Sequence, residues 1–238
     1  PAARRGGGAG GVGLRRRMAL DAIQDIAGIV LAAGAGRRMG YRPKALLQRD
    51  GQPLVARQIG LLAQCSVRRI MVVLGHHAAR IAPVLATTAT ALPGVDLNWV
   101  VNPTPDEGTG ASLRCALAAL PADLTGVMVL LADQPLLQVD DVACVLAAWR
   151  ARPADIDLIV PTHEGQPGHP LIFGPQVRQG VANGQGAAGV RDWRRAHPRQ
   201  VLALPVDHAR CTQDIDTEDD LARLTAEQGV RLSWPDVS

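Results

Sequence analysis

The sequence has few aromatic residues, few cysteines and no long apolar stretch, and each shortage excludes a class of protein. Aromatic residues make up 3% of the 238 positions, so the interleaved aromatic and basic side chains that bind single-stranded nucleic acid are missing. No apolar run approaches the roughly 20 residues that a membrane-spanning helix needs. The first residues are rich in Arg and Gly and lack the apolar segment of a secretory signal. We therefore expect a cytoplasmic protein that binds neither membranes nor nucleic acid.

The cysteines suggest neither a zinc site nor a disulfide framework. There are four, they lie far apart, and none forms a C-x-x-C pair: Cys65, Cys115, Cys144 and Cys211. This spacing is typical of reduced, structural thiols.

The basic pI of about 9.0 originates at the N-terminal end of the sequence. Residues 1–17 contain five arginines and no acid, and without them the formal net charge changes from +3 to −2. We interpret residues 1–21 as a disordered or expression-derived extension that precedes a single domain at 22–230. A basic tail that binds nucleic acid is the alternative interpretation.

Continuous apolar runs alternate with segments of helical periodicity from Ile26 onward. The runs cover 26–33, 68–75, 97–101, 126–133 and 156–161, and the helical segments cover 54–64, 76–86, 111–120 and 139–150. Because continuous runs are typical of strands buried on both faces, this order predicts an α/β fold of three layers, doubly wound around a mostly parallel, Rossmann-like sheet. A ligand site is then expected at the carboxyl ends of the strands.

The pattern changes after Pro161. Residues 161–200 are rich in Gly and Pro, and a last strand-like segment, 201–206, and a helix from Thr217 follow them. We interpret 161–200 as a subregion that binds an acceptor molecule.

A glycine-rich turn, LAAGAGRRMGYRPK at residues 31–44, follows the first apolar run. Such a turn lets backbone N–H groups approach phosphates. Its G-x-G-x-x-x-G spacing leaves an NAD(P)-binding oxidoreductase as an alternative, although the second strand ends in Gly75-His76-His77 where a ribose-binding acid is expected. A P-loop is excluded, because Tyr41 and not Lys-Ser/Thr follows Gly40.

The same segment resembles the signature of the MobA-like NTP transferases, and its LAAG form is most similar to molybdenum cofactor cytidylyltransferases. Four further segments agree in the expected order: EGTGASL (107–113), LADQP (131–135), GQPGHPLIF (165–173) and DIDTEDDL (214–221). The resemblance thus spreads over about residues 26–225. Near Gly184 the sequence departs from the family's G-D-x-G-A-R stretch, since it has Gln185 and displaces the arginine to Arg191.

The resemblance implies a role for each matching residue. Arg38, Lys44 and Asp133 would be catalytic, with Asp133 and Asp216 binding Mg²⁺, although Asp214 could replace Asp216 as the second ligand. The nucleotide would contact Leu31, Ala32, Ala33, Gly34, Gly36, Gly75, Gly108, Gly110 and Ser112, and the acceptor would contact Gly168, His169 and Pro170. Some of these residues have simpler interpretations: Asp216 as a helix cap, Thr109 and Ser112 as an ordinary helix start, His169 as a structural loop residue.

The implied function is transfer of CMP from CTP to a phosphorylated molybdopterin-type acceptor, with release of pyrophosphate and later delivery to a recipient molybdoenzyme. Ala33 carries the base preference, because guanylyl-transferring relatives resemble LAGG at this point. The terminal phosphate of the acceptor is already ionised at neutral pH, so positioning and charge neutralisation suffice, and no Ser/His/Asp signature is found. A different phosphorylated acceptor, an oxidoreductase and a non-catalytic cofactor chaperone are the alternatives.

Overall fold

A computed structural model describes residues 25–186 and 188–235, and the predicted N-terminal extension lies outside them. Its centre is a sheet of eight strands: β1 (Ile26–Ala32), β4 (Arg69–Leu74), β5 (Asp96–Val101), β6 (Gly126–Leu131), β7 (Leu158–His163), β8 (Gln166–Pro167), β9 (Leu171–Phe173) and β10 (Val201–Pro205). The helices are α2 (Leu54–Gln64), α3 (Ala78–Ala91), α4 (Thr109–Ala119), α5 (Val139–Ala151), α6 (Pro175–Ala182), α7 (Val190–Ala196) and α8 (Glu218–Gln228). All of the predicted strands and helices are present.

The strands follow the order β10-β7-β9-β6-β1-β4-β5, and β8 pairs with β7. Strands β6, β1, β4 and β5 are parallel neighbours, and so are β10 and β7. β9 lies antiparallel between β6 and β7. The long strands therefore all end at one edge of the sheet, which is where α/β folds bind ligands.

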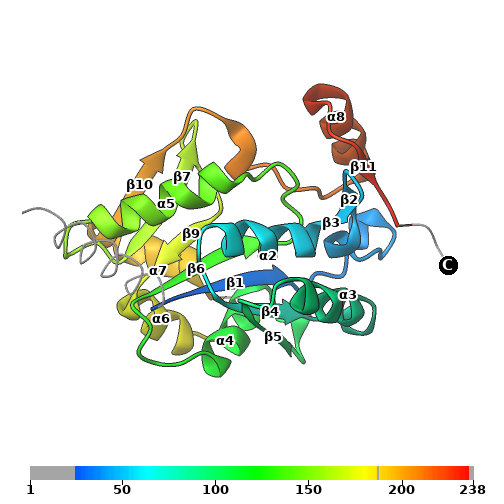
Figure 1. Cartoon of the computed structure of the whole chain (residues 1–238). Coiled ribbons are helices and arrows are strands. Elements are labelled where there is room, and N and C mark those ends of the chain that lie inside the picture. The colour runs from blue at the N-terminus through cyan, green and yellow to red at the C-terminus, as the bar shows by residue number, and fades with distance from the viewer. Residues whose placement is uncertain (1–24, 187, 236–238) are drawn as a thin grey trace, which may run out of the picture.

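Helices cover both faces of the sheet (Figure 1), which gives the three predicted layers. On one face α2, α3 and α5 pack on a core that includes Ile59, Leu85 and Trp149. On the other face α4, α6 and α7 pack on a second core that includes Leu117 and Trp193. The continuous apolar runs predicted this arrangement, because strands covered on both faces have no polar side.

A smaller unit stands beside the carboxyl edge of the sheet and includes α8 (Figure 1). There β2 (Gln48–Arg49), β3 (Gln52–Pro53) and β11 (Leu232–Ser233) form an antiparallel sheet. A third apolar cluster joins Met39 of the glycine-rich turn to Ile215, Leu224 and Leu232. The C-terminal segment thus packs directly against the turn and fixes its position.

Within the described residues, the helices are too short or too polar to cross a membrane. Each of the four cysteines is free, as their spacing predicted.

Candidate active site

The glycine-rich turn after β1 is folded tightly by its own backbone. Gly36 has a φ of 64°, and its carbonyl accepts from the N–H groups of Met39 and Tyr41 at 2.9 Å. A Cβ at Gly36 would lie 2.1 Å from the carbonyl oxygen of Arg42, so only glycine fits there. The buried Met39 anchors the turn, and the neighbouring Arg38 stays exposed.

Three carboxylates from two distant segments meet at the carboxyl edge of the sheet. Asp133, Asp214 and Asp216 each place a ligand atom within 4.8 Å of the others. The Nζ of Lys44 lies 2.5 Å from Oδ2 of Asp133 and 2.9 Å from Oδ1 of Asp216. Arg38 donates to the other oxygen of Asp216 at 2.5 Å. The predicted catalytic and metal-binding residues therefore come together in one cluster.

The cations of this cluster divide its carboxylates into two kinds. Partial burial alone would raise the pKa of Asp216, but Lys44 and Arg38 outweigh this effect and hold the pKa below its usual value. Burial, followed by the negative charges of Asp133 and Asp216, raises the pKa of Asp214. Burial lowers the pKa of Lys44, yet the carboxylates outweigh it and the net shift is upward. Asp214 is thus the member of the triad that most lacks a positive neighbour.

Thr217, and not Asp216, caps the N-terminus of α8. The hydroxyl of Thr217 accepts from the N–H of Asp220, and the Asp220 carboxylate accepts in return from the N–H of Thr217 at 2.9 Å. This capping box begins α8 without the side chain of Asp216. The Asp216 carboxylate faces Lys44 and Arg38 instead.

The expected nucleotide side of the site is formed by loops that pack closely on one another. A Cβ at Gly75 would lie 2.5 Å from the carbonyl oxygen of Ala33 and 2.9 Å from Cβ of Pro105. Ala33 is 8% exposed and belongs to the core beneath the sheet. Its methyl group therefore packs inward, so any influence on the base passes through the position of the loop backbone.

Other predicted nucleotide contacts have different surroundings. Ser112 is 3% exposed and accepts from Asn102 at 3.0 Å, which ties the end of β5 to the start of α4. Gly110 is buried, Gly108 is the N-cap residue that precedes α4, and Gly34 has open space where a Cβ would be. Leu31, Ala32 and Gly34 line a small hollow with Lys44 and Asp133. Gly34 thus lies next to the carboxylate cluster, whereas Ser112 shapes the loop from within.

Polar residues outside the predicted site connect these loops. Asp106 accepts from Arg37 at 2.8 Å and contacts His76 at 3.1 Å, and His77 contacts the carbonyl oxygen of Ala35 at 3.0 Å. These contacts join the glycine-rich turn to the loops after β4 and β5. The buried Asn102 could have been found from its place directly after an apolar run, as Asp133 was.

The predicted acceptor loop lies against the segment that leads to Asp214. A Cβ at Gly168 would lie 2.2 Å from the carbonyl oxygen of Cys211, and His169 donates its N–H to the same oxygen at 2.8 Å. The bond between His169 and Pro170 is cis. Burial lowers the pKa of His169 to about 4, so its imidazole is neutral at physiological pH.

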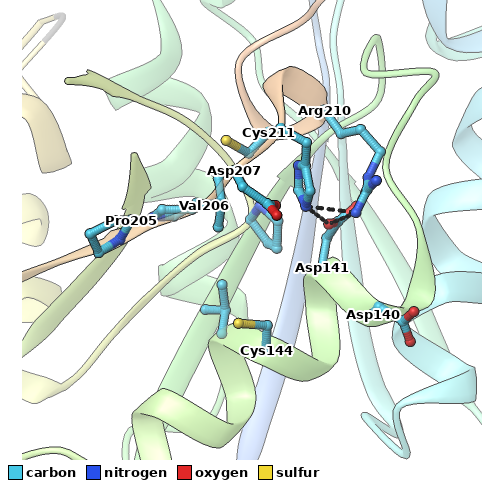
Figure 2. A pocket seen from close by; sticks show the side chains of 12 residues that line it. Asp140, Asp141, Cys144, Pro205, Val206, Asp207, Arg210 and Cys211 are labelled. Atoms are coloured by element: carbon cyan, nitrogen blue, oxygen red, sulfur yellow. Dashed lines mark hydrogen bonds and ion pairs between the residues drawn. The ribbon is translucent and has the colours of Figure 1, made fainter. Parts of the chain in front are cut away.

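A cavity of about 380 Å³ lies beside this segment, between α5 and the 3₁₀ helix η5 (Ala209–Cys211). Figure 2 shows the side chain of Arg210 ending beside Asp141 at the start of α5, and both residues line the cavity. Two hydrogen bonds join this pair, at 2.8 and 3.0 Å. Cys144 and Cys211 also line the cavity.

Comparison with known proteins agrees with the motifs and with the fold. The MobA-like NTP transferase domain matches residues 28–212. The chain belongs to this family. The bifunctional protein GlmU of Mycolicibacterium gilvum is 36% identical over 159 residues, which are 65% of this chain but 31% of that protein. The MobA-like chain thus spans less than a third of the relative's length.

Solved structures match this MobA-like domain over nearly their whole length. Rv0371c from Mycobacterium tuberculosis H37Rv superposes with a TM-score of 0.67 at 29% identity, covering 85% of this chain and 98% of that one. A complex of Rv0371c with manganese gives a TM-score of 0.64 at the same coverage and identity. Molybdopterin-guanine dinucleotide biosynthesis protein A from Archaeoglobus fulgidus, at 19% identity and a TM-score of 0.59, shares the fold over 85% of this chain and 98% of its own. The family match over residues 28–212 carries the assignment: the chain is a nucleotidyltransferase of the MobA-like family.

Proposed function

We propose that this nucleotidyltransferase transfers CMP from CTP to a phosphorylated molybdopterin-type acceptor and releases pyrophosphate. The observation that carries the proposal is the cluster in which Lys44 contacts Asp133 and Asp216 beside the glycine-rich turn. Cations and metal-binding carboxylates at a strand edge are what a phosphate-transferring site requires. The LAAG form of the turn supports CTP as the donor. The His-Pro pair at residues 169–170 supports a molybdopterin-type acceptor.

The carboxylates fit a divalent cation such as Mg²⁺. Their oxygens are hard ligands and converge within 4.8 Å, and Mg²⁺ prefers one or two carboxylates together with substrate phosphates. Asp133 and Asp216 would hold the ion, with Asp214 as a further oxygen donor. When bound, the ion neutralises charge on the triphosphate and orients it.

The residues of the chain have two tasks in this reaction. An oxygen of the acceptor's terminal phosphate attacks the α-phosphorus of CTP, the bond between the α-phosphorus and its bridging oxygen breaks, and pyrophosphate leaves with the electron pair. Lys44 and Arg38 donate to phosphate oxygens and stabilise the charge that develops on pyrophosphate. The turn around Gly34 offers backbone N–H groups to the triphosphate. The half-buried His169, whose pKa desolvation lowers to about 4, lines the acceptor side without adding charge there.

The direct test supplies each of CTP, GTP, ATP and UTP with Mg²⁺ to the purified protein, with and without acceptor. Pyrophosphate release and the mass of the product are measured for a molybdopterin-type acceptor and for a sugar 1-phosphate. We expect release to be fastest with CTP and the pterin acceptor, and a product heavier by one cytidylyl group. Transfer to the sugar phosphate alone would overturn the acceptor, and release with GTP at the same rate would overturn the cytidylyl assignment. Asp133→Asn is the matched inactive control.

A further inference from the structure

Two adjacent residues hold the segment that carries Asp214 at two points. The side-chain amide of Gln134 donates to the carbonyl oxygen of Cys211 at 2.9 Å, and the carbonyl oxygen of Asp133 accepts from the N–H of Ile215 at 3.0 Å. Asp214 lies between these two points. The distance between the carboxylates of Asp133 and Asp214 is therefore set partly by the amide of Gln134.

We infer that Gln134 is a positioning residue for the metal-binding carboxylates, an inference that rests on the proposed metal-dependent transfer. Gln134 is 2% exposed, so its hydrogen bond does not compete with water. Its backbone carbonyl in turn accepts from the fully buried Gln58 of α2 at 2.7 Å. The sheet-covering helix, the loop after β6 and the 211–216 segment are thereby joined in one chain of buried amides.

The opposite side of the segment has its own anchor, so a change at Gln134 acts locally. Arg210 makes a double hydrogen bond to Asp141, which also caps α5 by accepting from the N–H of Gln138. Figure 2 shows this pair, which holds η5 against the start of α5 through hydrogen bonds that do not involve Gln134. Without the amide of Gln134, η5 stays attached to α5 while the Cys211 carbonyl loses its side-chain tie to the loop that carries Asp133.

The same carbonyl also accepts from the N–H of His169 at 2.8 Å. The predicted acceptor loop and the carboxylate segment therefore share one hydrogen-bond acceptor with Gln134. Residues that orient metal ligands from behind typically change metal affinity by about 10- to 100-fold when they are replaced. We expect an effect of this size at Gln134, with little loss of chemistry once the metal is saturating.

The test compares Gln134→Leu with Arg178→Met. Leucine keeps most of the volume of Gln134 but cannot donate. Arg178 of α6 donates to the carbonyl oxygens of Leu117 and Leu120, at 2.9 and 2.8 Å, at the end of α4. Its replacement by methionine therefore removes structural hydrogen bonds that lie away from the carboxylates. Binding of Mn²⁺ alone is measured by electron paramagnetic resonance, and kcat is measured against Mg²⁺ concentration.

For Gln134→Leu we expect the Kd for Mn²⁺ to rise at least tenfold and the Mg²⁺ midpoint to rise with it, while kcat at saturating Mg²⁺ stays within about threefold. Arg178→Met should lower the melting temperature and leave both metal readouts unchanged. If Gln134→Leu does not fold, Gln134→Asn replaces it, because the shorter amide cannot reach Cys211 and should weaken Mn²⁺ binding in the same way.

A Kd within twofold of the unmodified protein, or an equal rise in Arg178→Met, would overturn the role of Gln134 and leave the proposed function standing. If the unmodified protein shows neither Mn²⁺ binding nor metal-dependent transfer, the proposed function fails as well.

Discussion

Replacing Lys44 with methionine tests the balance of charge in the carboxylate cluster. The Nζ of Lys44 lies 2.5 Å from Asp133 and 2.9 Å from Asp216, and its side chain is 16% exposed. Methionine keeps the length of the side chain but leaves three converging carboxylates with Arg38 as their nearest cation. Because the partners are only partly buried, we expect the loss to lie below that of a fully buried pair, at about 1 to 3 kcal/mol. For a chain of this size the melting temperature should fall by about 3 to 10 °C.

The assay records thermal unfolding of Lys44→Met in EDTA and in Mg²⁺. Magnesium should recover part of the lost stability, because an ion bound to the native carboxylates stabilises the folded state by mass action. In the transferase assay kcat/KM should fall by about 100- to 1,000-fold, since a group that stabilises the leaving pyrophosphate is missing.

Arg69→Met is the matched control for this change. Arg69 forms an exposed ion pair with Asp96 at 3.7 Å, and such pairs contribute at most about 1 kcal/mol. If Lys44→Met unfolds in EDTA at the temperature of Arg69→Met and keeps kcat/KM within tenfold of the unmodified protein, the assigned role of Lys44 is refuted.

Three further predictions follow from the site. Asp133→Asn should abolish turnover with an unchanged circular dichroism spectrum. Asp216→Asn should be at least tenfold more active than Asp133→Asn, since Asp214 remains beside position 216. Equal losses of kcat in the two variants would contradict this ranking. The kcat/KM for CTP should exceed that for GTP by about 10- to 100-fold. Ala33→Gly should lower this CTP/GTP ratio, because glycine loosens the loop backbone. An unchanged ratio in Ala33→Gly would show that Ala33 does not contribute to base selection. His169 has a native pKa of about 4 against roughly 6.5 when unfolded, so its neutral form stabilises the fold fully above pH 6.5. The free energy of unfolding should therefore decrease by up to about 3 kcal/mol as the pH falls from 6.5 to 4. In urea denaturation, the free energy of unfolding of His169→Asn should decrease less over the same pH range.

The sequence predicted the fold well because the signal for a buried parallel strand is local. Six apolar runs correspond to β1, β4, β5, β6, β7 and β10, and the helical segments between them begin and end within a few residues of the structure. The strands that were missed are short: β2, β3, β8 and β11 have two residues each, and β9, which follows Pro170, has three. Runs this short have no periodicity, and only the pairing of β9 with β6 and β7 makes it a strand.

The site was predicted unevenly, for a physical reason. Asp133 could be placed because a carboxylate directly after a buried run must lie at the strand edge. The contact between Lys44 and Asp216 joins positions 172 residues apart, and no local pattern encodes it. The tie from Gln134 to Cys211 is equally remote, since it depends on how η5 packs against the loop after β6. Motif resemblance supplied the residues of the cluster, and the structure supplied their partners.

The partners of Lys44 also bear on the order in which substrates enter. In the described structure its ammonium group neutralises the two carboxylates that the proposed function assigns to the metal. An ion that arrives alone must compete with this ammonium for Asp133 and Asp216. An ion that arrives with a triphosphate brings an anion that Lys44 can contact instead, so the displaced cation gains a new partner. Metal and nucleotide binding are then coupled through Lys44. Without nucleotide, Mg²⁺ should raise the melting temperature of Lys44→Met by more than that of the unmodified protein, and the difference measures how strongly the lysine opposes the ion.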